Sequence, residues 1–240
     1  MANAESLLTT PLPLVVLISG SGSNLQAIID QIDSGALCAE IKGVISNRED
    51  AYGLARARAA DMPTTVLDHR AYADRQSFDQ ALKKAVDAYH PELIILAGFM
   101  RILTPEFVNA YAGKLLNIHP SLLPKFQGLN THERALAEAN TNTEQNLAKM
   151  HGCSVHFVTE ELDGGPIIAQ SRIKIEAGDS PESLAVRVQH EEHKLYPLCI
   201  QWLAEGKIKL SEQGVACNGK LLPKQGLQFD NSDYSQLATL

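Results

Sequence analysis

Two residues near the middle of the chain have side chains suited to acyl-transfer chemistry. Asn117 and His119 lie two positions apart in and just after the apolar run 114–118, which predicts a β-strand, so both side chains point to one face. Pro120 and Pro124 end the strand and fix the backbone beyond it. An amide N–H stabilises a developing oxyanion, and an imidazole moves a proton near neutral pH. Taken alone, the pair is better explained as a buried Asn and a buried His that form hydrogen bonds with loop backbone.

A second polar segment follows downstream. Residues 154–159 predict another β-strand, and an acidic loop closed by Gly164-Gly165-Pro166 comes after it. Asp163 therefore lies in a tight turn, where backbone N–H groups can approach its carboxylate.

Together with two further segments, these motifs resemble the folate-dependent formyltransferase family. The further segments are Ile-Ser-Gly-Ser-Gly-Ser-Asn-Leu at 18–25 and Ala-Gly-Phe-Met-Arg-Ile-Leu at 97–103. The resemblance covers about residues 14–223 and is strongest to the members that formylate glycinamide ribonucleotide (GAR) in purine synthesis. It implies a catalytic trio of Asn117, His119 and Asp163, with 10-formyltetrahydrofolate as formyl donor and GAR as acceptor.

The glycine-rich turn 20–24 joins a predicted strand to a predicted helix, where backbone N–H groups and the helix dipole favour an anion. A dinucleotide site is disfavoured because Leu25 replaces the third glycine and no acidic residue ends the second strand. The resemblance implies that the turn binds the ribose phosphate of GAR, with two residues of a later helix nearby. The implied GAR residues are Gly22, Ser23, Asn24, Gln189 and Glu192.

The resemblance also implies a pocket for the folate. Its implied residues are Arg75 at the glutamate tail, Met100, Arg101, Ile102 and Leu103 along the pterin, Val108 and Leu115 as further walls, and the backbone of Glu160 and Glu161 at the pterin edge. Without the resemblance, Arg75, Gln189 and Glu192 read as solvated helix residues, and Arg101 as a packed stem with its head in water.

Composition limits the class of partner. Lys plus Arg total 21 and Asp plus Glu 28, so the net charge of −7 disfavours general nucleic-acid binding. The four cysteines are scattered, which favours a reduced, cytoplasmic location. No signal peptide or membrane span is predicted.

We expect no metal, because His190-Glu-Glu-His193 lacks the zincin spacing and His156 should point away from His151 and Cys153. The expected partners are therefore small molecules, with the protein a monomer or homodimer.

Strands and helices alternate over the first half of the chain. Strands are predicted at 14–19, 41–46, 64–67 and 93–97, and helices at 24–32, 52–60 and 78–89. This predicts an α/β fold with a Rossmann-like, mostly parallel sheet and helices on both faces. Antiparallel strands at 154–159 and 166–175, a helix over 181–205 that is straight or bent at Pro197, and a C-terminal hairpin with an Asn218-Gly219 turn should follow.

The predicted domain is single and spans 14–223. Its N-terminal half, about 14–115, should bind the nucleotide phosphate, and its C-terminal half, about 116–223, should bind folate and carry the catalytic residues. Residues 1–13 and 225–240 are expected to be flexible tails. Gln127, Asn130 and the longer loop 139–150 depart from the family pattern, and we expect none of them to touch the catalytic trio.

Three alternative functions remain. A formyltetrahydrofolate deformylase is expected to have a regulatory domain before the first strand, where 13 residues precede Leu14. A methionyl-tRNA formyltransferase is expected to have a longer, basic C-terminal domain. A non-catalytic nucleotide-binding module would explain the glycine turn but not Asn117, His119 and Asp163 together.

Overall fold

The structure, a computed structural model, describes residues 10–141, 149–231 and 233. The first half of the chain alternates strands and helices as predicted. Its elements are β1 (Leu12–Ile18), α1 (Ser23–Asp33), β2 (Ala39–Ser46), α2 (Tyr52–Ala59), β3 (Thr64–Val66), the 3₁₀ turn η1 (His69–Ala71), α3 (Arg75–Asp87) and β4 (Leu93–Leu96). These four strands pair in parallel, which agrees with the predicted fold class.

The second half of the chain contains both parallel and antiparallel strand pairs. Its elements are α4 (Pro105–Ala110), β5 (Leu115–His119), α5 (Thr131–Thr141), β6 (Met150–Phe157), β7 (Ile167–Lys174), α6 (Pro181–Ala204), β8 (Ile208–Ser211), β9 (Gly214–Cys217), β10 (Lys220–Leu221) and β11 (Leu227–Asp230). The main sheet has the order β11-β7-β6-β5-β4-β1-β2-β3, and β8, β9 and β10 form a separate small sheet. The Asn218-Gly219 turn joins β9 to β10, as predicted, with both residues at positive φ.

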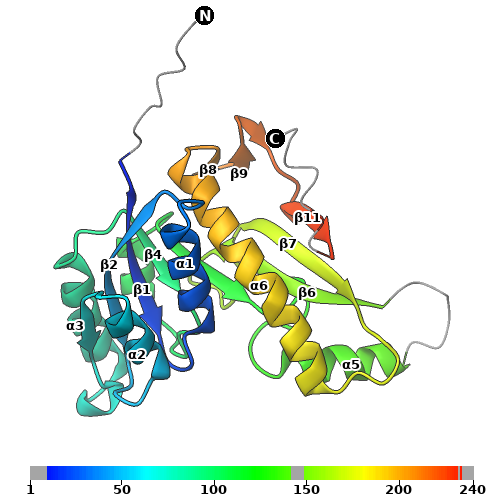
Figure 1. The fold of residues 1–240 in the computed structure, drawn as a ribbon, viewed down its shortest axis with the longest axis horizontal. Helices are drawn as coiled ribbons and strands as arrows, with labels where there is room; N and C mark the ends of the chain where they lie inside the picture. Colours follow the sequence, from blue (N-terminus) through cyan, green and yellow to red (C-terminus); the bar gives the residue numbers. More distant parts are fainter. Residues whose placement is uncertain (1–9, 142–148, 232, 234–240) are drawn as a thin grey trace, which may run out of the picture.

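Helices cover both faces of the main sheet. Along β1, Leu14, Val16 and Ile18 pack in one hydrophobic cluster, whereas Val15 and Leu17 pack in another. The first cluster includes buried side chains of α1, α2 and α6, and the second includes those of α3 and α4. Figure 1 shows α1 and α6 crossing the near face. The alternation of β1 thus supports two layers of helices, as the fold class requires.

The long helix α6 connects this core to the middle of the sheet. Ser180 caps its first turn through a reciprocal capping box, and the helix continues unbroken past Pro197 to Ala204. The fully buried Tyr196 places its hydroxyl 3.1 Å from the Leu96 carbonyl oxygen and 3.0 Å from that of Leu116. Therefore α6 is fixed against the last residue of β4 and against the residue of β5 that precedes Asn117.

The prediction that residues 225–240 form a flexible tail is partly wrong. Leu227–Asp230 forms β11, which pairs in parallel with β7 at the edge of the main sheet. Phe229 is buried, and its ring lies 6.1 Å from that of Trp202. Similarly, β1 begins at Leu12, two residues before the predicted domain boundary. Residues 1–9, 232 and 234–240 lie outside the described residues, and the two-half division of the domain stays a prediction.

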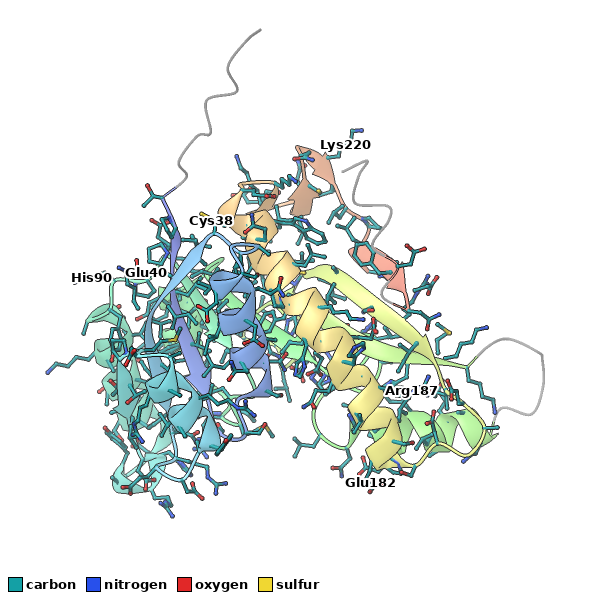
Figure 2. All side chains as sticks on the ribbon, viewed as in Figure 1. Cys38, Glu40, His90, Glu182, Arg187 and Lys220 are labelled. Carbon is teal, nitrogen blue, oxygen red and sulfur yellow. The ribbon has the colours of Figure 1, made fainter. Side chains whose placement is uncertain are left out.

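In the described part of the chain, none of the four cysteines forms a disulfide, and no helix is long and apolar enough to cross a membrane. Cys38 lies beside the C-terminal part of α6, where its backbone N–H donates to Gln201 Oε1 at 2.8 Å (Figure 2).

Candidate active site

The pairing of β5 with β6 brings the catalytic candidates together. In this antiparallel ladder Asn117 lies opposite His156, and His119 lies opposite Ser154. Directly opposed residues share a face, so all four side chains point the same way. Since Asn117 and His119 end a strand that is parallel to β4, they lie at the carboxyl edge of the parallel strands, where ligands bind in open α/β sheets.

His119 contacts two acceptors. Its Nδ1 lies 3.4 Å from Asp163 Oδ2, and its Nε2 lies 2.9 Å from the carbonyl oxygen of Phe126. The Phe126 carbonyl can only accept, so Nε2 carries a hydrogen. A ring that is protonated on both nitrogens satisfies both acceptors. The side chains of His119 and Asp163 are 7% and 10% exposed, so their interaction is shielded from water.

Asp163 is held by the turn that follows β6. It adopts the left-handed conformation, φ 50°, which Asp tolerates better than most residues. The Gly128 N–H donates to Asp163 Oδ2 at 2.9 Å. Gly165 allows the turn to pack tightly, because a Cβ there would lie 1.9 Å from the Phe157 carbonyl oxygen. The predicted tight turn around Asp163 is confirmed, and the backbone N–H that bonds its carboxylate, that of Gly128, comes from the loop after β5.

His156 is a site residue that the sequence analysis set aside. Its Nδ1 lies 2.9 Å from the Phe157 carbonyl oxygen and therefore donates to it, which leaves Nε2 as an acceptor. Asn117 Nδ2 donates to that Nε2 at 3.2 Å and to Asp163 Oδ1 at 3.4 Å. Burial lowers the pKa of His156 to about 4, so the ring is neutral at pH 7. The sequence analysis predicted antiparallel pairing of 154–159 with 166–175, and not with the strand that carries Asn117, so it gave no signal that places His156 beside Asn117.

The loop after β5 is fixed by side chains of β6 and β7. Ser154 Oγ donates to the Ser121 carbonyl at 2.6 Å and accepts from the Leu123 N–H at 3.0 Å. Gln170 Nε2 donates to the Leu123 carbonyl at 2.9 Å. These bonds hold the segment that carries Phe126 and Gly128, and so hold the partners of His119 and Asp163.

One departure from the family pattern does touch the trio, contrary to expectation. Gln127 Nε2 donates to the backbone oxygen of Asp163 at 3.3 Å. Asn130 takes a positive φ of 56° just before α5. Of the longer loop 139–150, the first three residues end α5 and Met150 begins β6, whereas residues 142–148 lie outside the described residues.

On the acceptor side, α1 and α6 meet through two side-chain hydrogen bonds. Gln189 Nε2 donates to Ser23 Oγ at 3.0 Å, and Asn24 Nδ2 donates to Glu192 Oε2 at 2.8 Å. The structure thus brings together four of the five predicted GAR residues, from two segments more than 160 positions apart. The fifth, Gly22, precedes the first turn of α1, whose N-terminus has no side-chain cap among the described residues.

The Asn24–Glu192 pair is almost fully buried. Burial raises the pKa of Glu192 to about 7, against the opposing effect of the Asn24 hydrogen bond. Asn24 Oδ1 is also buried and has no hydrogen-bond partner within the described residues. An unsatisfied buried carbonyl is costly, so it marks a position where a donor on a ligand would be favoured.

The glycine turn is packed tightly against α2. Gly22 has a φ of 70°, and a Cβ on it would lie 2.5 Å from the Cα of Gly53. The Gly53 N–H donates to the Gly20 carbonyl at 3.0 Å, and Arg56 Nε donates to the Ser21 carbonyl at 2.9 Å. A cavity of about 310 Å³ opens beside Ser23, lined also by Gln26, Arg56 and His193.

The donor-side candidates fall into three groups. Met100 and Ile102 are exposed, at 63% and 57%, on the segment after β4. Val108 and Leu115 are buried in the second hydrophobic cluster, and Leu103 packs at its edge. Glu160 and Glu161 are exposed in the loop after β6, where Glu160 Oε1 accepts from Asn109 Nδ2 at 2.7 Å.

Two arginines complete the donor side. Arg75 begins α3 and is exposed, and within the described residues no side-chain hydrogen bond or ion pair joins it to the other folate candidates. Arg101 Nε is buried without a hydrogen-bond partner in the same part of the chain. Nearby, the buried Asp79 accepts from the Thr104 N–H at 2.5 Å, which anchors the end of the 100–103 segment. Within the described residues no cluster of His, Cys, Asp and Glu could hold a metal ion.

A family model described as "Formyl transferase" matches residues 12–200, which include every catalytic candidate. The chain belongs to the formyl transferase family. Its sequence is 49% identical over 217 residues to the phosphoribosylglycinamide formyltransferase of Escherichia coli, covering 90% of this chain and 99% of that protein.

Solved structures of formyltransferases are similar to this structure over most of the chain. A phosphoribosylglycinamide formyltransferase from Coxiella burnetii matches with a TM-score of 0.85 and 52% identity, covering 91% of this chain and 99% of that one. A glycinamide ribonucleotide transformylase from Symbiobacterium toebii matches with a TM-score of 0.81 and 40% identity, over 90% of this chain and 99% of that one. This formyl transferase therefore shares its fold with transformylases over almost all of its described length.

Proposed function

We propose that this formyl transferase moves the formyl group of 10-formyltetrahydrofolate to the amine of GAR, in purine biosynthesis. The observation that carries the proposal is the convergence of Asn117, His119 and Asp163 at one strand end of a chain that belongs to this family. Relatives with high identity over nearly the whole chain are named for that reaction.

The reaction needs no covalent enzyme intermediate. The GAR amine attacks the formyl carbon, and a C–N bond forms as the carbonyl π pair moves to oxygen. The amine then loses a proton, N10 of the folate gains one, and the C–N10 bond breaks as the oxyanion collapses to the amide. The protein has to stabilise the oxyanion and carry one proton between two nitrogens.

The geometry supports a distinct role for each residue. The Asn117 amide nitrogen contacts His156 at 3.2 Å and Asp163 at 3.4 Å. The contact with Asp163 is the longer of the two, so the N–H that makes it is the easier one to redirect to an oxyanion. The second donor would be the Nδ1–H of His119, redirected from Asp163 Oδ2, because this 3.4 Å contact is longer than the 2.9 Å contact of Nε2 with the Phe126 carbonyl oxygen. The Asp163 carboxylate would stabilise the imidazolium. His156 holds the Asn117 amide in the orientation that presents N–H groups.

GAR would bind at Gly22, Ser23, Asn24, Gln189 and Glu192, where the uncapped start of α1 suits a phosphate. The donor would bind along Met100–Leu103 with Val108, Leu115, Glu160, Glu161 and, at its tail, Arg75. The exposed Met100 and Ile102 provide apolar surface for a flat heterocycle. We further propose a cytoplasmic location, with no nucleic-acid or membrane partner.

One assay tests the proposal. Purified protein with 10-formyltetrahydrofolate should release tetrahydrofolate only when GAR is present, and formyl-GAR should appear in equal amount. Release of formate and tetrahydrofolate without GAR would instead identify a deformylase. If neither product formed while NAD(H) bound, the proposal would fail in favour of a nucleotide-binding module.

A further inference from the structure

The buried Ser19 joins the loop after β1 to the loop after β4. The β1–β4 ladder ends where the Ala97 N–H donates to the Leu17 carbonyl at 2.9 Å. Beyond this point Gly98 turns the chain away with a φ of 72°. The loop after β1 leads into the glycine turn, and the loop after β4 leads into the 100–103 segment. Each loop therefore carries one of the two proposed substrate subsites.

The Ser19 hydroxyl spans this gap. Its Oγ accepts from the Met100 N–H at 2.8 Å and donates to Asn47 Oδ1 at 2.5 Å. Ser19 and Asn47 are 5% and 2% exposed, so both hydrogen bonds are protected from water. The Asn47 side chain is held in turn by His69, whose Nδ1 lies 3.2 Å from Asn47 Nδ2. The hydroxyl is thus fixed in orientation at the ends of β1, β2 and β4.

We propose that Ser19 is a positioning residue that sets the distance between the GAR subsite and the folate subsite. The inference rests on the proposed function. Transfer between two bound substrates depends steeply on how the reacting atoms are placed, and a misplacement of about 1 Å costs roughly 10²-fold in rate. The buried Ser19 hydroxyl would therefore control the rate through the spacing of the two subsites, and we assign it no contact with either substrate.

Kinetics of Ser19→Ala provide the first test. At saturating concentrations of both substrates, kcat should fall by about 10- to 100-fold, because both substrates still bind but their reacting atoms are no longer aligned. Ser46→Ala is the matched control, since Ser46 is a fully buried serine at the end of β2. Among the described residues its Oγ bonds only within its own turn, to the backbone of Arg48. It should keep wild-type turnover.

A linked ligand separates spacing from simple loss of structure. The probe is a folate-like ring joined by a rigid linker to a GAR-like ribose phosphate, measured beside its two separate halves. If Ser19 sets the spacing, Ser19→Ala should weaken the linked probe by more than the product of its effects on the halves. The inference would be overturned if the loss of affinity for the linked probe equalled the product of the losses for the two halves, and if kcat were no lower than in Ser46→Ala.

Asn47→Ala keeps the test decisive if Ser19→Ala does not fold. It removes the acceptor of the Ser19 O–H while leaving the hydroxyl in place. The fall in kcat and the extra weakening of the linked probe should therefore both appear, each smaller than in Ser19→Ala. Purely multiplicative losses in Asn47→Ala would also overturn the inference. The wild-type assay separates the two proposals, because absence of GAR-dependent transfer there refutes the proposed function, whereas normal transfer with insensitive variants refutes only the role of Ser19.

Discussion

Asn117 donates to Nε2 of His156 at 3.2 Å, straight across the β5–β6 ladder. The neutral, buried imidazole thereby fixes which end of the Asn117 amide faces the site. An amide that can flip presents oxygen as readily as N–H, and oxygen would repel a developing oxyanion. The cross-strand pair therefore turns an ordinary asparagine into an oriented donor.

His119→Ala and Asp163→Ala should each lower kcat by roughly 10²–10³-fold, the usual effect of removing an oriented oxyanion donor or its partner. The fold should persist, because both side chains lie at a strand end or turn. Turnover and far-UV circular dichroism measure the two properties. Asp230→Asn, which changes an exposed ion pair with Arg172 at the sheet edge, is the control and should retain full activity. Near-normal turnover in both active-site variants would exclude the mechanism.

His156→Leu should reduce kcat by about tenfold or more, because Asn117 loses the acceptor that orients its amide. The same variant should be less sensitive to acid. Burial lowers the pKa of His156 from 6.5 to about 4, so its contribution to stability is full above pH 6.5 and is lost as the pH falls through 4. Melting temperatures at pH 5 and 7.5 measure the difference. The exposed His90 (Figure 2) is the control position, and His90→Gln should follow the wild type.

Gly53→Ala should weaken the binding of GAR and leave the affinity for the folate unchanged. A Cβ at Gly53 would lie 2.6 Å from Ile18 Cδ1 and 3.1 Å from the Cα of Gly22, so it presses on the glycine turn from behind. Separate titrations of the two ligands measure the effect. Gly20→Ala is the matched change in the same turn, since its Cβ would meet no atom within 4 Å, and it should cost less affinity for GAR. Equal weakening of both ligands by Gly53→Ala would contradict the placement of the phosphate.

Glu192→Gln should flatten the dependence of stability on pH. Burial raises the pKa of Glu192 from 4.5 to about 7, so its contribution to the free energy of unfolding is full below pH 4.5 and is lost as the pH rises through 7. The contribution is on the order of 3 kcal/mol. Urea unfolding at pH 5 and 8 measures it, with the exposed Glu212→Gln as control. An identical slope in Glu192→Gln and the wild type would show that the buried carboxyl does not titrate in this range.

Much of the first half could be predicted because its signals are local. The run from Leu14 to Ile18 is apolar, and its alternate residues pack in two different clusters, so it had to be buried on both faces. Asn218-Gly219 predicted a hairpin turn because both residues adopt positive φ readily. The helices α4 and α5 were not predicted. The first has six residues, and the second has small residues, Ala135 and Ala139, at its buried positions.

The sequence by itself determined the strand runs, the glycine turn and the identity of Asn117, His119 and Asp163, because each rests on a short pattern of residue types. Only the tertiary structure decided that His156 orients Asn117, that Gln127 reaches Asp163, and that Leu227–Asp230 closes the edge of the sheet. Ser19 belongs with this second group. The physical reason is that strand register and loop-to-loop hydrogen bonds join residues from 28 to 81 positions apart, as for Ser19 with Asn47 and Met100, and no local pattern encodes a partner at that distance.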